Sequence, residues 1–200
     1  MKFSIEDIDR ILQSNEISNF NDIISKRKIN NLVHFTRLEN LSSILKNGFR
    51  SRKYLQENNL SFQYNDTERW DNKTNAICFS IEYPNIFLLN KFKQIYLGSK
   101  WLIIILDVNI LLDSKLVKSF CMRNAGGLSK WLEHSICHYS SAFEKMFCEN
   151  PCSKVPKRSE QNYIKDYLPT DIQAEIFVLQ IMLMRYYINI ILLLMKNILS

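Results

Sequence analysis

A run of apolar residues in the middle of the chain limits the fold more than any other feature of the sequence. It extends from Trp101 to Val108 and is interrupted only by Asp107. A short, near-continuous apolar run of this kind is typical of a strand that is buried on both faces. We therefore expect a β-sheet with this segment near its centre and other elements covering the sheet.

Shorter apolar stretches predict further strands, and apolar residues at helical spacing predict helices. Strands are expected at residues 32–36, 76–81, 117–123 and 174–178. Helices are expected at residues 3–13, 17–28, 38–48, 109–115 and 138–147, and long polar loops at 54–75 and 149–166. Because strands and helices do not alternate regularly, the expected class is α+β.

The composition is that of one mid-sized globular domain. The chain has 200 residues, of which 46% are hydrophobic and 23% are charged, so disorder and collagen-like repeats are excluded. The formal net charge of +6 argues against an acidic binding protein and permits an anionic partner such as a nucleotide or a nucleic acid. Glu6 and Asp7 stand where a secretory signal has its apolar core, and the five cysteines are an odd number, so we expect a reduced, cytoplasmic protein.

The last part of the chain is almost wholly apolar. Residues 176–195 are as long as the ~20 residues that span a bilayer, but Gln180, Arg185 and Asn189 interrupt them. A central arginine costs about 2.5–3.5 kcal/mol on insertion scales, so we favour a buried strand that runs into a terminal apolar element. We expect one domain over residues 1–180 and an atypical apolar tail over 181–200, and a membrane partner is not expected.

One group of candidate metal ligands stands out in the sequence. It consists of His134, Cys137, His138, Cys148 and Cys152. Adjacent Cys137 and His138 followed by a CxxxC pair do not have the spacing of a standard zinc finger or ribbon. We therefore expect buried thiols here and no metal.

Three places combine a polar, reactive side chain with a strand or its edge. His34 and Thr36 are two residues apart, so they point to the same side of their strand. Arg69 lies in a dense cluster of charges, and Gln173 and Glu175 share one face at the entry to the last strand. Taken singly, His34 is explained by a buried core position and Arg69 by a solvated loop. A carboxylate beside apolar residues is costly to bury unless it has a partner, so Glu175 is a candidate for a functional site.

Taken together, these places and their neighbours have the order and spacing of a known family. The matching pieces are Leu32 to Leu41, Ile44, Gly48-Phe49, Glu68 to Asp71, Ala76 to Ile81 before Pro84-Asn85, and Gln173 to Ile176. In these pieces the sequence resembles ADP-ribosyltransferases, and specifically the DarT group of toxins that ADP-ribosylate bases in DNA. The resemblance extends from Leu32 to Val178, and its first and last pieces are the most specific.

The resemblance implies a split β-sheet, with NAD+ lying as a substrate across a cleft between two small sheets. By analogy, Glu175 is the catalytic glutamate, and Arg69 joins it by gripping the cofactor or the target base. His34 and Thr36 are expected at the ribose and nicotinamide side of NAD+, and Asn40 is expected to shape the cavity. The full set expected to bind the cofactor is His34, Thr36, Asn40, Leu41, Arg69, Ser80 and Gln173.

The resemblance also implies partners. These are single-stranded DNA and NAD+, with a macrodomain hydrolase as antitoxin in a toxin–antitoxin or phage-defence pair. Before its last strand the sequence lacks the aromatic-proline run of thymidine-modifying members, so guanine is slightly favoured over thymine as the target base. Two alternatives stay open: an ADP-ribosyltransferase that acts on RNA or protein, and a non-catalytic nucleic-acid-binding or membrane-associated protein.

Basic and aromatic residues outside these motifs are candidates for contacts with a nucleic-acid strand. Cations of two segments could follow a phosphate backbone, and three aromatic residues could stack on unpaired bases. They are Arg50, Arg52, Lys53, Lys154, Lys157 and Arg158, together with Tyr54, Phe62 and Tyr64. Solvated loops are the alternative explanation.

Overall fold

The computed structural model describes residues 5–66, 73–125, 139–150, 155–179 and 188–189. Its helices are α1 (Ile5–Arg27), α2 (Leu41–Asn47), α3 (Arg52–Glu57), α4 (Ile86–Ile95) and α5 (Ser140–Lys145). Its strands are β1 (Asn31–Arg37), β2 (Ala76–Ile81), β3 (Trp101–Asp107), β4 (Val117–Cys121), β5 (Glu175–Leu179) and β6 (Ile188–Asn189). Short 3₁₀ turns, η1 (Leu38–Asn40), η2 (Val108–Leu112) and η5 (Arg158–Glu160), complete the order.

The strands form one sheet in the order β4-β5-β2-β1-β3-β6, and neighbouring strands pair antiparallel. The expected α+β class is confirmed. The apolar run that predicts a buried strand is β3, which lies between β1 and the short strand β6, next to the edge of the sheet and not near its centre as expected. Leu102 and Ile104 are buried in one core and Trp101 and Ile103 in another, so β3 is covered on both faces as its sequence predicts.

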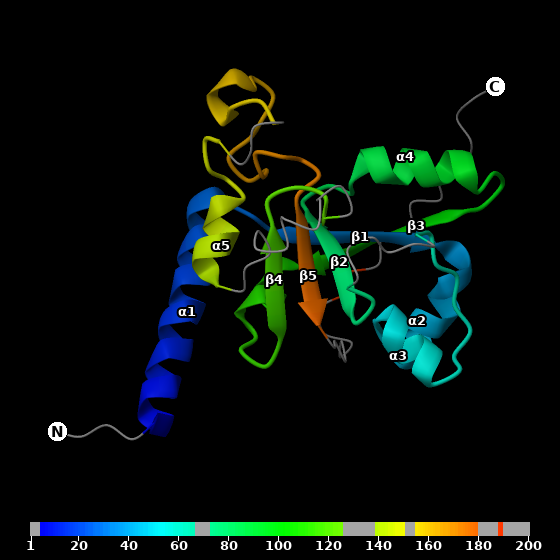
Figure 1. The fold of residues 1–200 in the computed structure, drawn as a ribbon, viewed down its shortest axis with the longest axis horizontal. Coiled ribbons are helices and arrows are strands. Elements are labelled where there is room, and N and C mark those ends of the chain that lie inside the picture. Colours follow the sequence, from blue (N-terminus) through cyan, green and yellow to red (C-terminus); the bar gives the residue numbers. More distant parts are fainter. Residues whose placement is uncertain (1–4, 67–72, 126–138, 151–154, 180–187, 190–200) are drawn as a thin grey trace.

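The sheet is split between β1 and β2. Every residue of β1 is paired with β3, from Asn31 with Asp107 to Arg37 with Trp101. The register with β2, by contrast, pairs only Leu32 with Ile81 and Val33 with Ser80. Beyond Val33 the two strands separate, and Figure 1 shows β1 and β3 running across the direction of β2, β5 and β4.

Two layers of helices cover the two faces of the sheet. α1 and α5 lie together on the side of β4 (Figure 1), where the Phe20 ring lies 5.5 Å from that of Phe120 and 5.8 Å from that of Phe143. α4 covers part of the other face, because its Leu89 packs in a separate cluster with Val33 of β1. The split therefore opens between α4 on one side and α2 and α3 on the other (Figure 1).

Four helical elements differ from the sequence prediction. The two helices expected at 3–13 and 17–28 form one helix, α1, because neither Gly nor Pro interrupts the segment between them. α3 lies at the start of the loop expected at 54–75, and α4 lies where the sequence analysis assigned no element. The helix expected at 109–115 is the short turn η2.

The described part of the chain has no helix that is both long and apolar enough to cross a membrane. Much of the expected apolar tail, residues 181–187 and 190–200, lies outside the described residues. Arg69 and the candidate metal ligands His134, Cys137, His138 and Cys152 also lie outside them. Among the residues that the structure does describe, no three metal-ligating side chains gather into a site. The domain boundary expected near residue 180 stays a prediction.

Candidate functional site

A cavity of about 860 Å³ lies where β1 and β2 separate. This size falls within the ~300–1,000 Å³ of typical ligand sites. Its walls come from β1 and β2, from the segment 43–66 that carries α3, from α4, and from Asn124, Gln173 and Glu175. Segments that are far apart in the sequence thus meet at the split.

His34 bridges the gap between the separating strands. Its Nδ1 lies 2.8 Å from the carbonyl oxygen of Cys78 on β2, and its ring meets those of Phe49 and Phe79 edge-on at 5.2 and 5.9 Å. A carbonyl oxygen only accepts hydrogen bonds, so Nδ1 carries the proton, and Nε2 is the acceptor nitrogen of the neutral ring. The fold therefore fixes both the tautomer and the plane of this imidazole.

Asn40 joins the end of β1 to the polar segment that follows α3. Its Nδ2 donates to the Thr36 hydroxyl at 2.8 Å and to the Gln63 carbonyl at 2.7 Å, and its Oδ1 accepts from the Gln63 amide at 2.7 Å. Asn40 and Thr36 are both buried. Asn40 therefore holds one wall of the cavity.

Glu175 is the first residue of β5 and lies half-buried at the cavity. Its carboxylate accepts a hydrogen bond from the Ala125 amide at 2.9 Å and one from the Asn124 side chain at 3.4 Å. Phe79 of β2 pairs with Ile176 of β5. Ser80 follows Phe79 and Glu175 precedes Ile176, so in this antiparallel pair Ser80 and Glu175 lie at the same end of the sheet. These contacts fix the direction of the carboxylate within the site.

The fold raises the pKa of two acidic groups near Glu175. Burial raises the pKa of the Cys121 thiol to about 11, and the charge of Glu175, its partner in the sheet register, also raises it. Burial likewise raises the pKa of Asp171, whose carboxylate accepts from the Gln173 amide at 2.8 Å. The Cys121 thiol therefore adds no second negative charge beside Glu175 near neutral pH.

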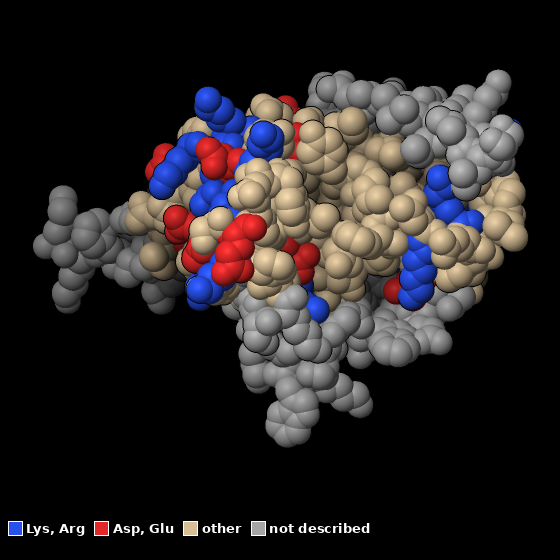
Figure 2. Space-filling model, turned by 90° about the horizontal axis from the view of Figure 1, so that it is seen from above, with Lys and Arg blue, Asp and Glu red and all other residues tan. Residues whose placement is uncertain are grey.

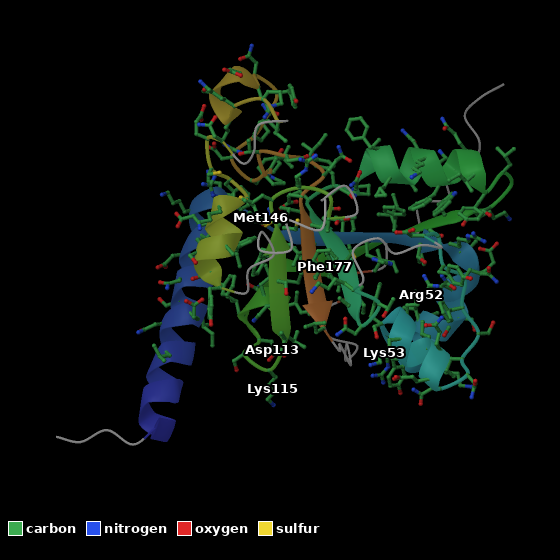
Figure 3. The ribbon with its side chains drawn as sticks, viewed as in Figure 1. Arg52, Lys53, Asp113, Lys115, Met146 and Phe177 are labelled. Carbon is green, nitrogen blue, oxygen red and sulfur yellow. The ribbon has the colours of Figure 1, made fainter. Side chains whose placement is uncertain are left out.

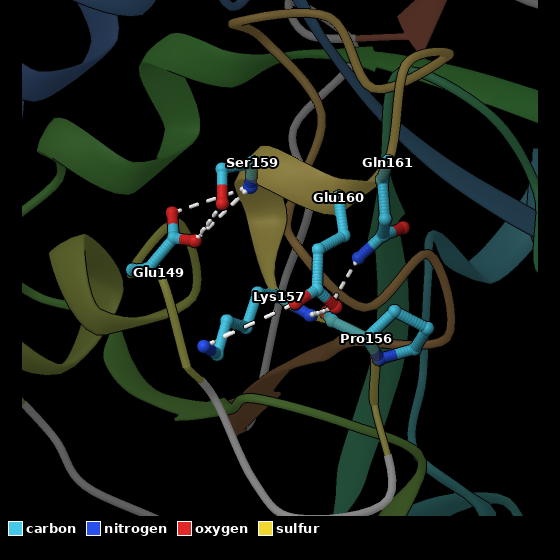
Figure 4. A network of polar contacts seen from close by, with 6 residues as sticks. All are labelled: Glu149, Pro156, Lys157, Ser159, Glu160 and Gln161. Atoms are coloured by element: carbon cyan, nitrogen blue, oxygen red, sulfur yellow. Dashed lines mark hydrogen bonds and ion pairs between the residues drawn. The ribbon is translucent and has the colours of Figure 1, made fainter.

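The segment that leads to Glu175 is held by its own polar contacts. Arg158 donates to the carbonyls of Lys165 at 2.8 Å and Leu168 at 2.9 Å, and Gln161 donates to the Thr170 carbonyl at 3.1 Å. Figure 4 shows the rest of this network, in which Glu149 accepts from Ser159, Lys157 pairs with Glu160, and Gln161 also donates to Pro156. Arg158, expected as a phosphate contact, thus has its guanidinium engaged with loop carbonyls.

Arginines on the α3 side of the cavity stack on aromatic rings. The guanidinium of Arg52 lies 4.2 Å from the centroid of Tyr64, and that of Arg50 lies 4.4 Å from that of Tyr54. Figure 3 shows Arg52 and Lys53 at the end of the molecule away from α1. Tyr54 and Tyr64, expected to stack on bases, are therefore partly covered by arginines of the same chain.

Charge is distributed unevenly on the face seen from above. Figure 2 shows basic and acidic side chains mixed at one side and basic ones at the other, with a broad uncharged surface between them. Arg50, Arg52 and Lys91 all line the cavity, so cations do reach the split itself.

The structure brings most of the predicted site residues together. His34, Thr36, Asn40, Ser80, Gln173 and Glu175 all line the cavity. Leu41 packs against the main core instead, and Arg69 lies outside the described residues. Gln173 lies in a turn rather than in the strand, which begins only at Glu175.

The sequence analysis missed the contribution of α4. Asn85 caps this helix, and Phe87 and Lys91 of the helix line the cavity. The sequence does contain a signal for the start of α4. Asn85 follows Pro84 and precedes an apolar run at helical spacing, which is a pattern that marks a helix start. No sequence pattern marked Asn124, whose side chain contacts Glu175, as a residue of the site.

The fold and the site define the class of the protein. A split antiparallel sheet with a fixed carboxylate and a fixed imidazole at the split is the arrangement expected of an ADP-ribosyltransferase. A comparison with family models identifies the family, since the DarT model, described as ssDNA thymidine ADP-ribosyltransferase, matches residues 33–193. The chain therefore belongs to the DarT family of enzymes, which use NAD+ to ADP-ribosylate single-stranded DNA. No curated protein matches the chain.

Proposed function

We propose that this protein transfers ADP-ribose from NAD+ to a base of single-stranded DNA, with Glu175 as the catalytic carboxylate. The observation that carries the proposal is the position of Glu175. Its carboxylate is held by the Ala125 amide at a cavity that also receives His34, Thr36 and Ser80.

The chemistry of transfer explains why a fixed carboxylate is needed. Breaking the bond between nicotinamide and ribose leaves positive charge at the ribose carbon C1″ and its ring oxygen. A carboxylate that accepts a hydrogen bond from the 2″-hydroxyl stabilises this charge as it develops. A ring nitrogen of the base then forms the new bond to C1″ and loses its proton to a basic group.

The other predicted residues have roles in binding. We assign His34, Thr36, Ser80 and Gln173 to contacts with NAD+, and Asn40 to holding the wall of the cavity. Leu41 contributes by packing behind that wall. The cavity has the size of a cofactor site, and Arg50, Arg52 and Lys91 supply positive charge for a pyrophosphate.

Arg69 stays in the proposed catalytic set. Its guanidinium is not deprotonated under ordinary conditions, so it suits orientation of an anion or a base better than proton transfer.

The target base is a separate proposal. The sequence slightly favours guanine, whereas the family description names thymidine. We take thymidine as the first base to test, because the match to that family covers most of the chain. Guanine is the second base, and the same assay decides between them.

We further propose that the protein is the toxin of a toxin–antitoxin or phage-defence pair. Modified bases block templates, so a macrodomain hydrolase that removes ADP-ribose is the expected antitoxin. Co-expression of such a hydrolase should restore growth to cells that are arrested by this protein, and unrelieved arrest would contradict the pairing.

Incubation of the purified protein with NAD+ and oligonucleotides of restricted base content tests the proposed reaction. We expect a gain of one ADP-ribose by mass spectrometry on strands that contain the target base. Glu175→Gln should lower the rate by at least about a hundredfold, because it removes the charge that stabilises the transition state. Glu57→Gln, an exposed change on α3, is the matched control and should leave the rate unchanged. Transfer to RNA or protein alone, or equal rates for wild type and Glu175→Gln, would overturn the proposal.

A further inference from the structure

Asn85, at the start of α4, carries a hydrogen-bond donor for which the described residues provide no partner. The residue is only 3% exposed and lines the cavity. Its Oδ1 accepts a hydrogen bond from the Leu88 amide at 3.1 Å and so caps the helix. Its Nδ2 is buried and has no hydrogen-bond partner among the residues that the structure describes.

Capping α4 does not require this donor. The N-cap role uses only the side-chain oxygen, and Ser, Thr and Asp fill it about as well as Asn. Ser51 shows this in the same protein, since its hydroxyl caps α3 by accepting from the Tyr54 amide. Buried polar groups without a partner are rare in folded proteins, so an additional buried donor beside a cavity indicates a missing acceptor.

The position of Asn85 in the fold relates this donor to the proposed site. Ser80 pairs with Val33, so their side chains share one face of the sheet, and α4 packs on that face through Leu89 and Val33. Glu175 and Phe177 are two residues apart on β5, so their side chains share one face of the sheet. Phe177 pairs with Cys78, which shares a face with Ser80 two residues later on β2. Glu175 therefore lies on the same face as Ser80. Asn85 therefore stands on the same side of the sheet as Ser80 and Glu175.

The unpartnered group is a pure donor, which restricts the ligand atom that it recognises. Since Oδ1 is already used by the helix, Nδ2 selects an oxygen that accepts, such as an amide carbonyl or a phosphate oxygen. The start of a helix also favours negatively polarised atoms. NAD+ carries acceptors of both kinds.

Burial favours NAD+ over the DNA strand as the source of this oxygen. Asn85 is almost fully buried, whereas Phe87, two residues further along, is 60% exposed. A ligand that fills the cavity reaches a buried donor more readily than a polymer that passes over its mouth.

We propose that Asn85 is an NAD+-binding residue, whose Nδ2 donates a hydrogen bond to an acceptor oxygen of the cofactor while its Oδ1 caps α4. This inference rests on the proposed binding of NAD+ in the cavity. It assigns one residue two functions, and only the contact with NAD+ requires an amide.

Asn85→Ser separates the two functions, because serine keeps a capping oxygen and lacks the amide donor. In a titration with NAD+ alone, without DNA, we expect the dissociation constant to rise about three- to tenfold, which corresponds to one lost hydrogen bond. The melting temperature should stay close to that of the wild type. Asn85→Asp, which also keeps the capping oxygen, provides a second variant if the serine variant does not fold, and it should bind NAD+ more weakly too.

Asp107→Ser is the matched control. Asp107 caps η2 by accepting from the Asn109 amide and lies outside the cavity, so this change should leave NAD+ binding as it is in the wild type. Equal affinities for wild type and both folded Asn85 variants would overturn the inference and leave the proposed function intact. A wild-type protein that does not bind NAD+ would overturn both.

Discussion

The Nδ1 atom of His34 lies 2.8 Å from the carbonyl oxygen of Cys78, and this hydrogen bond crosses the point where β1 and β2 separate. In a continuous sheet a backbone amide would donate to that carbonyl. Here a side chain takes over the role of the backbone, so the strands separate and the carbonyl still has a donor. The same contact fixes the imidazole at the cavity.

Replacing His34 should lower the stability of the protein through the loss of this hydrogen bond. His34→Ala removes the donor to Cys78 and should lower the free energy of unfolding by about 1–2 kcal/mol, measured in urea. His34→Asn places an amide donor near the position of Nδ1 and should recover most of this loss. Equal stability of the alanine and asparagine variants would show that the hydrogen bond does not hold the split.

The contacts of Asn40 predict a local loosening of the cavity wall. Asn40→Ala leaves the Gln63 amide and carbonyl and the Thr36 hydroxyl without their partner, which should cost about 2–3 kcal/mol. Hydrogen exchange at the Gln63 amide should become faster. Thr36→Val is the control, because it removes one of these contacts and leaves the amide of Gln63 protected. Unchanged exchange in Asn40→Ala would contradict the assignment.

Arg158 should affect both turnover and NAD+ binding through the segment that it holds. Its guanidinium organises the segment that leads to Gln173 and Glu175, and a lysine cannot reach the same set of carbonyls with one ammonium group. Arg158→Lys should therefore lower kcat, and it should also raise the dissociation constant of NAD+, because Gln173 is among the residues proposed to bind the cofactor. Glu160→Gln, a change at an exposed ion pair in the same segment, should alter stability by less than about 0.5 kcal/mol and keep kcat. Equal effects of the two substitutions would refute the positioning role.

Cys121 predicts a loss of stability at alkaline pH. Its pKa is raised from 9.0 to about 11 in the folded protein, so the folded chain keeps a proton that the unfolded chain releases. Stability is therefore lost as the pH rises through this window, by up to about 2–3 kcal/mol. The measurement is the free energy of unfolding at pH 9 and pH 11 for wild type and Cys121→Ala. The wild type should lose more than the variant by this amount, and parallel curves would show that the thiol does not titrate in this way.

Local sequence signals found most of the strands and missed two helices. The strand predictions at 76–81 and 174–178 lie within one residue of β2 and β5, because short apolar runs between polar turns carry the signal themselves. α3 and α4 were missed although Ser51 and Asn85 both cap them in the usual way. Their sequences are short, and much of their stability comes from packing on the cavity wall rather than from a long periodic pattern.

The motifs in the chain, through the family that they resemble, by themselves predicted the family and many of the residues that line the cavity. His34, Thr36, Gln173 and Glu175 were named from short local patterns, because such patterns record the chemistry that each side chain supplies, whereas Asn40 and Ser80 were named through the resemblance. Only the tertiary structure decided how these residues meet. Contacts between segments far apart in the chain set the loss of pairing after Val33 and the hydrogen bond from the Ala125 amide to Glu175. They also leave the Asn85 amide without a partner among the residues that the structure describes. Such contacts are set by packing and strand register, which no single stretch of sequence encodes.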